Sequence, residues 1–247
     1  MALIKCPECG KEVSEYAKAC PNCGFPIGEY LEYNRGFMDI DSDKKVSYVK
    51  KKDKANIVVG DYITMGSYPQ GLYGEIMPIK WKVLCIENDK ALIISEYGLD
   101  GKRFNNYKLE VTWETCDLRK WLNNVFYNKA FTPAEKQDII LSNITADANP
   151  RWNNNQGKDT QDYIFVLSIL EANKYFNFDG GRKCYGTAYC LRHVSDYRDD
   201  CCWWWLRSVG SDMRCTANVY PDGKISDSGD GNANIREAVR PAMWIKI

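Results

Sequence analysis

The sequence has no excess of charge of either sign and no long apolar run. Of its 247 residues, 33 are Lys or Arg and 33 are Asp or Glu, so the formal net charge is +0. A balanced chain has no overall positive field to attract nucleic acid or an anionic membrane. No apolar run approaches the roughly 18 residues of a membrane helix, and the first residues lack a signal peptide's apolar region. We therefore expect a cytoplasmic protein with no membrane partner, and nucleic acid is not its expected ligand.

The sequence also contains a single histidine, His193. Cys190, Ser195, Asp196 and Asp199 lie close to it in the sequence, so a catalytic pair of nucleophile and base is one interpretation. The partners in such a pair usually lie far apart in the sequence. The pattern therefore favours a surface or structural histidine.

Cysteine, by contrast, is abundant, and four of the 11 cysteines form two Cys-Pro-x-Cys-Gly motifs. In each motif the glycine permits a tight turn that directs backbone amides toward the thiolates. Four thiolates form the ligand set of structural Zn²⁺, and a segment of this length needs such a metal to fold. A redox dithiol is the alternative. The predicted zinc ligands are Cys6, Cys9, Cys20 and Cys23. The segment resembles the short zinc ribbon at the start of many bacterial proteins, which contacts either nucleic acid or protein.

The remaining cysteines show no paired spacing. Their number is odd, which fits a reducing cytosol better than an exported disulfide framework. They are Cys85, Cys116, Cys184, Cys190, Cys201, Cys202 and Cys215.

The composition predicts three parts: a zinc ribbon at 1–28, a linker at 29–57 and an α+β domain at 58–247. The linker ends in a lysine-rich run at 50–54, and acidic residues lie just upstream. The lysines are interpreted as a solvated face, with a phosphate-binding patch as the alternative.

Local patterns predict the elements of the main domain. A first strand ends at Gly66, and a polar joint connects a hairpin of 79–85 and 91–95. One helix starts near Thr112, because apolar residues recur at helical spacing from Leu118. The remaining expected elements are a second helix from a capping box at 132–135 through Ile139, Ile140 and Ile144, a strand at 163–167, a capping box at 168–171 and a hairpin around the Pro-Asp-Gly turn at 221–223.

The most apolar stretch is Trp203-Trp204-Trp205-Leu206, followed by a closing strand at 238–245. Consecutive side chains in a strand point to opposite faces, so both faces of this strand are expected to be covered. Arg207 and Arg240 flank these anchors and are expected to bond carbonyls or carboxylates, with binding of a substrate anion as the alternative.

Several motifs resemble a bacterial domain-of-unknown-function family over residues 58–247. They are YITMGSYPQ (62–70), PIKWKVL (78–84), TWETCDLRKWLN (112–123), WWLRS (204–208) and VRPAMWI (239–245). The order of elements is also similar to the C-type-lectin-like fold of formylglycine-generating enzymes and of the variable proteins of diversity-generating retroelements. This resemblance implies that 62–65 pairs antiparallel with 242–245, and that the C-terminal hairpin region presents the ligand face.

Two departures limit what the resemblance implies. The sequence lacks the Glu-Pro-Asn or Gln-Pro-Asp motif and the Trp-Asn-Asp motif of calcium-dependent sugar-binding lectins. Cys201 and Cys202 are adjacent, whereas formylglycine-generating enzymes use a spaced cysteine pair. Neither sugar binding through calcium nor that catalytic route is therefore expected.

Two polar runs in the final third mix side-chain chemistries in the way that recognition loops do. An ordinary loop without a partner is the alternative. The candidate ligand-binding residues are Ser211, Asp212, Met213, Arg214, Cys215, Asp230, Asn232, Asn234 and Arg236. Oxygen-bearing side chains at Asp227, Asp230, Asn232 and Asn234 leave calcium binding open, but the spacing does not follow the EF-hand pattern, so a polar loop is favoured.

These observations predict a C-type-lectin-like domain with an N-terminal zinc ribbon, acting as a non-catalytic module that binds a protein or other ligand through its C-terminal face. The resemblance implies a variable protein of a diversity-generating retroelement as one form of this function. The alternatives are an enzyme of the formylglycine-generating type and a zinc-ribbon protein that binds nucleic acid. A cleft that gathers perturbed Cys, His and carboxylate groups would favour the enzyme, and a continuous basic stripe would favour nucleic acid.

Overall fold

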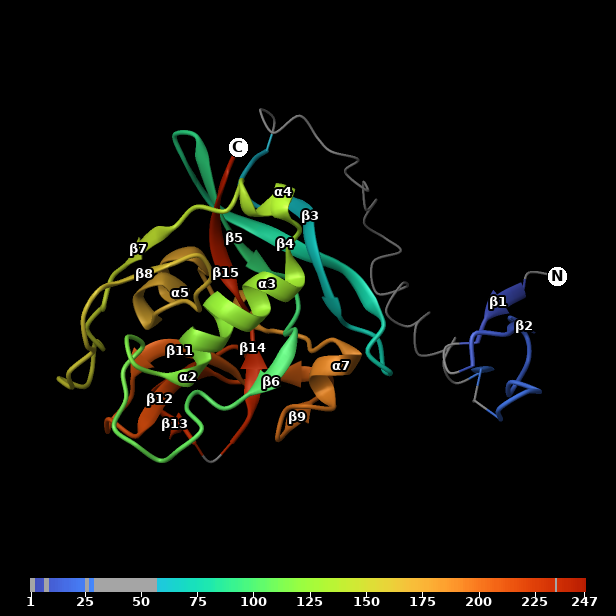
Figure 1. Ribbon diagram of the computed structural model, residues 1–247. Coiled ribbons are helices and arrows are strands. Elements are labelled where there is room, and N and C mark those ends of the chain that lie inside the picture. The colour runs from blue at the N-terminus through green and yellow to red at the C-terminus, as the bar shows by residue number, and fades with distance from the viewer. Residues whose placement is uncertain (1–2, 7–8, 25–26, 29–56, 234) are drawn as a thin grey trace.

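The computed structural model describes residues 3–6, 9–24, 27–28, 57–233 and 235–247 of the chain (Figure 1). These residues form an N-terminal cysteine-rich unit and a mixed α+β domain in which strands predominate. The lysine run at 50–54 lies outside the described residues. Within them, no helix is long and apolar enough to cross a membrane.

The N-terminal unit contains two short antiparallel strands, β1 (Leu3–Lys5) and β2 (Glu12–Ser14). Its buried core consists of Cys6, Val13, Cys20 and Ile27, and it is separate from the core of the main domain. A core of this size buries too little apolar surface to fold a chain without a metal or a disulfide.

The first sheet of the main domain has four antiparallel strands in the order β15-β5-β4-β3 (Figure 1). Its strands are β3 (Tyr62–Pro69), β4 (Ile76–Glu87), β5 (Lys90–Ser95) and β15 (Ala242–Lys246). The β4–β5 pair confirms the predicted hairpin, and Asn88 in its turn has a φ of 53°.

Two predictions about β3 are wrong. The strand continues past Gly66, where an irregular register accommodates the positive φ of the glycine. The predicted pairing of 62–65 with 242–245 does not occur, because β3 pairs with β4 while β15 pairs with β5. The β4–β5 hairpin therefore separates the first and last strands of this sheet.

The second sheet has five strands in the order β13-β12-β11-β14-β6. They are β6 (Asp100–Lys102), β11 (Trp204–Val209), β12 (Cys215–Val219), β13 (Ile225–Gly231) and β14 (Glu237–Val239). The β12–β13 pair confirms the predicted hairpin, in which Tyr220 N donates to Lys224 O and Gly223 has a φ of 91°.

The tryptophan stretch forms the middle of this second sheet. Trp204 and Trp205 both have 0% exposure although consecutive strand residues face opposite ways, so both faces of β11 are covered as predicted. Each indole N–H finds a backbone acceptor, Arg182 O for Trp204 and Lys102 O for Trp205.

The predicted closing strand at 238–245 is two strands that belong to different sheets. Val239 O in β14 accepts from Leu99 N, and Pro241 O accepts from Ser95 N as the chain passes to β15. Proline has no N–H to donate, which favours a break in the ladder at this position. The Arg240-Pro241 step therefore connects the two sheets.

A continuous helical stretch lies in front of the junction between the sheets (Figure 1). It comprises α2 (Asp117–Trp121), a π-helical turn η2 (Leu122–Phe126) and α3 (Tyr127–Ala130). The stretch begins at Asp117 rather than near Thr112. Leu118, Leu122 and Phe126 are buried as expected, but Val125 is 55% exposed. A π-helical turn adds residues to the turn and so rotates the predicted apolar stripe.

Both capping boxes are present, although the helix that follows the box at Thr132 is shorter than predicted. The box at Thr132 opens α4 (Pro133–Lys136), which ends before Ile139 and Ile140, while Ile144 lies in strand β7 (Ser142–Ile144) paired with β8 (Thr160–Asp162). The second box, at Ser168, opens α5 (Ile169–Tyr175).

The predicted strand at 163–167 is an extended segment that joins the two sheets. Phe165 exchanges two backbone hydrogen bonds with Ala242 of the first sheet, at 3.0 and 2.7 Å. Leu167 O accepts from Arg207 N of the second sheet at 2.9 Å. Its contacts therefore alternate between sheets instead of forming a continuous ladder.

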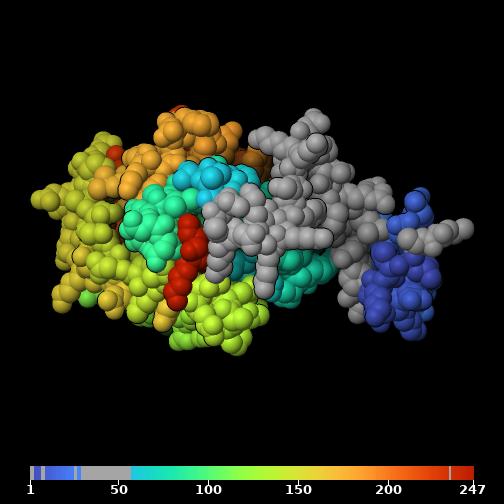
Figure 2. Space-filling model, turned by 90° about the horizontal axis from the view of Figure 1, so that it is seen from above, coloured from blue at the N-terminus to red at the C-terminus, as the bar shows by residue number. Residues whose placement is uncertain are grey.

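The segment at 178–202 contains short elements. They are α6 (Asp179–Arg182), α7 (Ala188–Leu191), β9 (Tyr197–Arg198) and β10 (Cys201–Cys202). The chain then returns through β11 to β15, and Figure 2 shows its red C-terminal end at the surface beside the green β4–β5 hairpin. There Ile247 N donates to Asp89 O at 2.9 Å.

Candidate functional site

The four predicted zinc ligands come together in the N-terminal unit. Their Sγ atoms all lie within 4.8 Å of one another, and Cys6–Cys23 and Cys9–Cys20 are separated by 3.6 and 3.7 Å. Tetrahedral coordination at about 2.3 Å per Zn–S bond places sulfurs about 3.8 Å apart. The four cysteines are therefore positioned to bind one metal ion, consistent with structural zinc.

The backbone around the thiols also fits a metal knuckle. Gly10 and Gly24 have φ values of 70° and 79°, and their N–H groups donate to Cys6 O and Cys20 O at 2.9 Å. Burial acts to raise the pKa of Cys20, but hydrogen bonds from the Asn22 and Cys23 backbone and from neighbouring thiols outweigh it and lower the pKa to about 6. A thiol with a lowered pKa supplies a thiolate ligand at neutral pH. Four protein ligands leave no open position for chemistry, so the site is structural.

The first polar run, 211–215, lies between β11 and β12. Ser211, Asp212 and Arg214 are exposed, and Met213 and Cys215 are half-buried. The loop is anchored by its backbone, because Met213 O accepts from Val111 N at 3.1 Å and Cys215 N donates to Asp212 O at 2.9 Å. Three of the five predicted residues therefore present their side chains to solvent on a fixed loop.

The second polar run, 230–236, is less exposed than predicted. Asp230 is half-buried in β13, Arg236 is exposed, and Asn234 lies outside the described residues. Asn232 has 0% exposure, which contradicts its predicted display. Its amide donates to Leu109 O at 3.1 Å, and its backbone bonds Arg214 O and Asn105 N, both at 2.9 Å. Asn232 therefore braces the loops instead of contacting a ligand.

The two runs lie side by side, because Cys215 pairs with Gly231 and Asn232 N reaches Arg214 O. A third segment, 105–111, joins them and was not predicted from the sequence. Its Tyr107 and Leu109 side chains are 72% and 56% exposed. Asn105 and Asn106 favour a turn, but residues 105–111 carry no motif that links them to the other two runs, so the tertiary contacts reveal that they belong here. We call the surface formed by 105–111, 211–215 and 230–232 the loop face.

The carboxylates considered for calcium are engaged by protein donors. Asp227 Oδ1 lies 3.5 Å from Arg151 Nη1, and Asp230 Oδ2 accepts from Asn218 Nδ2 at 2.6 Å. Among groups of three or more His, Cys, Asp or Glu side chains in the described part of the chain, only the four-cysteine cluster has metal-binding geometry. The polar-loop interpretation therefore fits these residues better than a calcium site.

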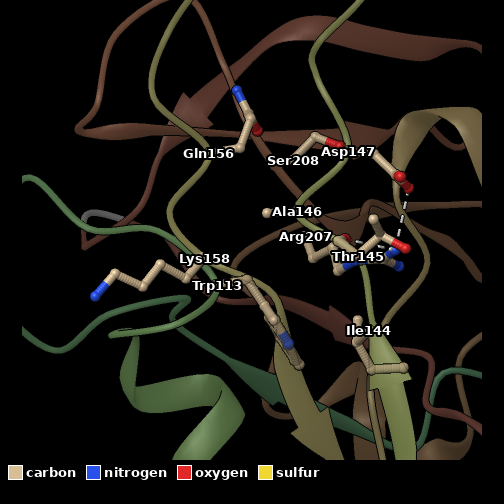
Figure 3. A pocket seen from close by; sticks show the side chains of 9 residues that line it. All are labelled: Trp113, Ile144, Thr145, Ala146, Asp147, Gln156, Lys158, Arg207 and Ser208. Atoms are coloured by element: carbon tan, nitrogen blue, oxygen red, sulfur yellow. Dashed lines mark hydrogen bonds and ion pairs between the residues drawn. The ribbon is translucent and has the colours of Figure 1, made fainter.

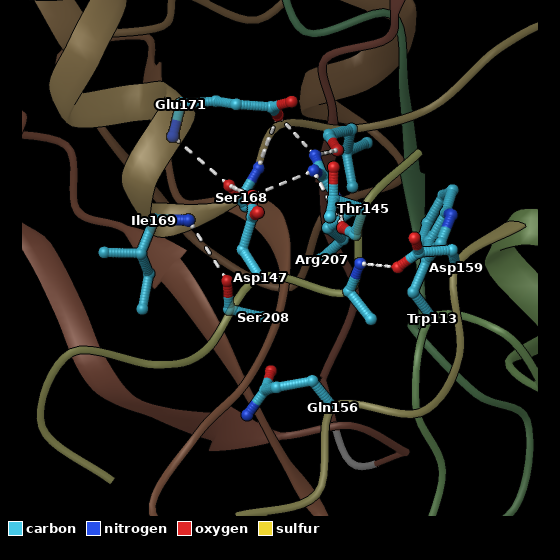
Figure 4. A network of polar contacts seen from close by, with 12 residues as sticks. Trp113, Thr145, Asp147, Gln156, Asp159, Ser168, Ile169, Glu171, Arg207 and Ser208 are labelled. Atoms are coloured by element: carbon cyan, nitrogen blue, oxygen red, sulfur yellow. Dashed lines mark hydrogen bonds and ion pairs between the residues drawn. The ribbon is translucent and has the colours of Figure 1, made fainter. Parts of the chain in front are cut away.

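Arg207 is buried and bonds carboxylates and carbonyls, which is the first of the two alternatives predicted for it. Its side chain is 3% exposed and forms ion pairs with Glu171 and, at 3.1 Å, with Asp147 (Figure 4). It also donates to Thr145 O and Val166 O. A buried guanidinium is tolerated only when carboxylates and carbonyls satisfy it in this way. The network connects β11 to α5, to the segment just before α5 and to the loop that follows β7.

A small cavity lies beside this network, lined in part by Trp113, Asp147, Gln156 and Arg207 (Figure 3). Its volume is about 10 Å³, room for at most one water molecule. It cannot admit a substrate, so the anion-binding alternative for Arg207 finds no space here. Arg240 is similarly internal, donating to Ser95 O at 3.0 Å and to Arg182 O at 3.3 Å.

The His193 side chain bonds a backbone carbonyl, and the cysteines near it are buried. His193 Nδ1 lies 2.6 Å from Tyr189 O, and its ring packs against the Tyr189 ring at 4.1 Å. Burial raises the pKa of the Cys184 thiol to about 12 and raises that of Cys190 well above its usual range. Buried thiols of this kind are poor nucleophiles and poor ligands. The histidine is therefore structural, and the enzyme alternative gains no support from these groups.

The fold and the cysteine site define a two-part protein in which a zinc ribbon precedes a mixed α+β domain. Comparison with family models agrees, because a zinc-ribbon domain matches residues 5–27. The chain belongs to the family described as Domain of unknown function (DUF6273), whose model matches residues 88–247. No curated protein and no solved structure matched the chain.

Proposed function

We propose that the α+β domain is a non-catalytic module that binds a protein partner through the loop face. The observation that carries the proposal is the exposure of Tyr107 and Leu109 beside the charged side chains of Asp212 and Arg214. Large exposed apolar side chains surrounded by polar groups are typical of protein-interaction surfaces. Loops held on a rigid scaffold commonly carry such binding.

The loop face is organised before any partner binds. Backbone hydrogen bonds link its three segments, from Val111 N to Met213 O and from Asn232 N to Arg214 O. Arg214 also pairs with Glu110 at 3.1 Å. A surface that is already ordered loses less conformational entropy when it binds, which favours affinity.

The architecture of the module is proposed to be C-type-lectin-like. Supporting this, the strands nearest the two ends of the domain, β3 and β15, share one sheet, and the C-terminal hairpin lies in the other. The exposed positions at Ser211, Asp212 and Arg214 make few core contacts, as a variable protein of a diversity-generating retroelement requires of its diversified positions. We place the protein in the cytosol, a reducing compartment, because none of its eleven cysteines is paired in a disulfide.

The proposal is tested by crosslinking in living cells from a photoreactive residue placed at position 212. A matched control carries the same residue at position 89, in the exposed β4–β5 turn of the other sheet. We expect a discrete protein adduct from position 212 only, and its loss when Tyr107→Ser and Leu109→Ser are combined. These exposed changes should shift unfolding free energy by less than about 0.5 kcal/mol.

Two results would overturn the proposal. One is the same adducts, or none, from positions 212 and 89. The other is an adduct from position 212 that persists undiminished in the Tyr107→Ser, Leu109→Ser variant, because those side chains would then not belong to the contact.

A further inference from the structure

A second, larger cavity opens beside the β12–β13 hairpin. Its volume is about 540 Å³, within the roughly 300–1,000 Å³ typical of small-molecule sites. Its lining consists of Trp203 and two groups of residues, which we call its walls. The hairpin wall is Tyr220, Pro221, Asp222 and Asp230, and the opposite wall is Lys183, Tyr185, Arg198, Asp199 and Cys201. Of the residues in the loop face, only Asp230 lines it.

Aromatic rings contribute much of the apolar lining. The Trp203 and Tyr220 rings meet edge to face with centroids 6.4 Å apart. Tyr220 is 39% exposed, and Tyr185, on the opposite wall, is 48% exposed. Three aromatic side chains around one opening offer a ligand flat apolar contact area.

The hairpin wall presents one carboxylate without a cation. Asp222 is paired with Lys224, whose Nζ lies 3.3 Å from Oδ2. Asp230 accepts a hydrogen bond from the neutral amide of Asn218, and no ion pair to it is formed among the described residues. A half-buried carboxylate in this setting favours a cationic partner.

The opposite wall has an excess of one positive charge. It carries Lys183 and Arg198 against a single carboxylate, Asp199. The Arg198 guanidinium lies 5.4 Å from the centre of the Trp203 ring, and within the described part of the chain neither cation forms an ion pair. The two walls therefore carry net charges of opposite sign, and the Trp203 ring also lines the cavity.

We propose that this cavity binds a small zwitterion, a molecule with one ammonium group, one carboxylate and an apolar part, such as a free amino acid. The ammonium pairs with Asp230, and the carboxylate pairs with Lys183 and Arg198. The apolar part packs on Trp203 and Tyr220. A purely cationic or purely anionic ligand would satisfy one wall and be repelled by the other.

The test is calorimetric titration of the full chain with three probes of one shape. They are L-phenylalanine, its amide, which lacks the carboxylate, and its N-acetyl derivative, which lacks the ammonium. We expect phenylalanine to bind at least about tenfold more tightly than either analogue, since each loses one charge-assisted pair. Equal affinity for all three, or no binding of phenylalanine at about 10 mM, would overturn the proposal.

Variants assign the two ends of the ligand. Asp230→Asn should weaken phenylalanine and its amide but leave the N-acetyl derivative unchanged, whereas Lys183→Gln should weaken phenylalanine and the N-acetyl derivative only. Asp222→Asn on the same wall is the matched control, because Lys224 already neutralises that carboxylate. Unchanged affinity in both test variants, or an equal loss in the control, contradicts the assignment. If Asp230→Asn fails to fold, the probe series and Lys183→Gln still decide the question.

Discussion

Asn218 and Glu237 form a buried pair in the second sheet, and their hydrogen bonding depends on a proton. Asn218 is 0% and Glu237 is 3% exposed, and Asn218 Nδ2 donates to Glu237 Oε1 at 2.6 Å. Asn218 Oδ1 and Glu237 Oε2 have no donor among the described residues. A protonated Glu237 supplies that donor, because Oε2–H can bond Oδ1 and complete an amide–acid pair. Burial, and to a smaller extent Asp230, raises the pKa of Glu237 well above its usual range.

This pair predicts a specific pH dependence of stability. In the unfolded chain Glu237 loses its proton near pH 4.3, while in the folded protein it keeps the proton to higher pH. The stabilisation is therefore complete below about pH 4.3 and declines as pH rises toward the folded-state pKa. Glu237→Gln keeps both hydrogen bonds without titrating. We expect the difference in unfolding free energy, wild type minus variant, to fall by up to about 1.4 kcal/mol per pH unit from about pH 5 upward.

Denaturant unfolding of both proteins at several pH values measures this difference. A difference that does not change with pH would mean that Glu237 is ionised in the folded protein, contrary to the pairing described above.

At the scale of elements, strand β11 anchors the second sheet more firmly than β15 anchors the first. Trp204 is fully buried, and its indole N–H bonds Arg182 O at 3.0 Å. Trp244 in β15 is only half-buried, and Lys90 lies over its ring at 4.3 Å. Of these two tryptophans, Trp204 is therefore expected to contribute more to the stability of the fold.

We expect Trp204→Ala to lower the unfolding free energy by about 3–5 kcal/mol, because it opens a cavity between the sheets and α6. Trp244→Ala should cost about 2 kcal/mol, since part of its side-chain surface already contacts water. Thermal or denaturant unfolding of both variants tests the order. Trp204→Phe provides a milder probe if the alanine variant does not fold, and a larger loss in Trp244→Ala than in Trp204→Ala would contradict the assignment.

At the scale of the whole molecule, the ribbon and the α+β domain have separate cores. Zinc binding of roughly 10–16 kcal/mol is large enough to fold the ribbon, whereas the domain has its own apolar interior. Cys20→Ser should therefore abolish zinc binding and unfold the ribbon, while the main unfolding transition stays within about 0.5 kcal/mol of wild type.

Native mass spectrometry of the reduced protein counts the zinc, and calorimetry follows the domain. A Lys18→Ser variant, exposed in the same unit, is the matched control and should retain one zinc ion. Full zinc content in Cys20→Ser, or no metal on the wild-type protein, would contradict the four-cysteine site.

Features whose interacting partners lie within a few residues were predictable from the sequence. The two cysteine knuckles, the capping boxes at Thr132 and Ser168, and the turns of the hairpins at 88–89 and 221–223 are all present where it placed them. Each depends on local geometry, such as a positive φ at Gly223 or a side chain that reaches an amide three residues ahead. Local chemistry of this kind is encoded directly in adjacent residues.

The pairing of strands and the burial of polar side chains depend on contacts between distant parts of the chain. Sequence patterns could not reveal that β4 and β5 separate β3 from β15, that Pro241 divides the closing strand, or that Asn232 is buried beneath residues 105–111. Strand alternation gives the faces of a strand but not its neighbours, and an Asn has the same local preference whether it braces loops or meets solvent. The loop face and the two-walled cavity both depend on contacts between residues tens to more than a hundred positions apart. Those contacts are set by packing of the whole domain.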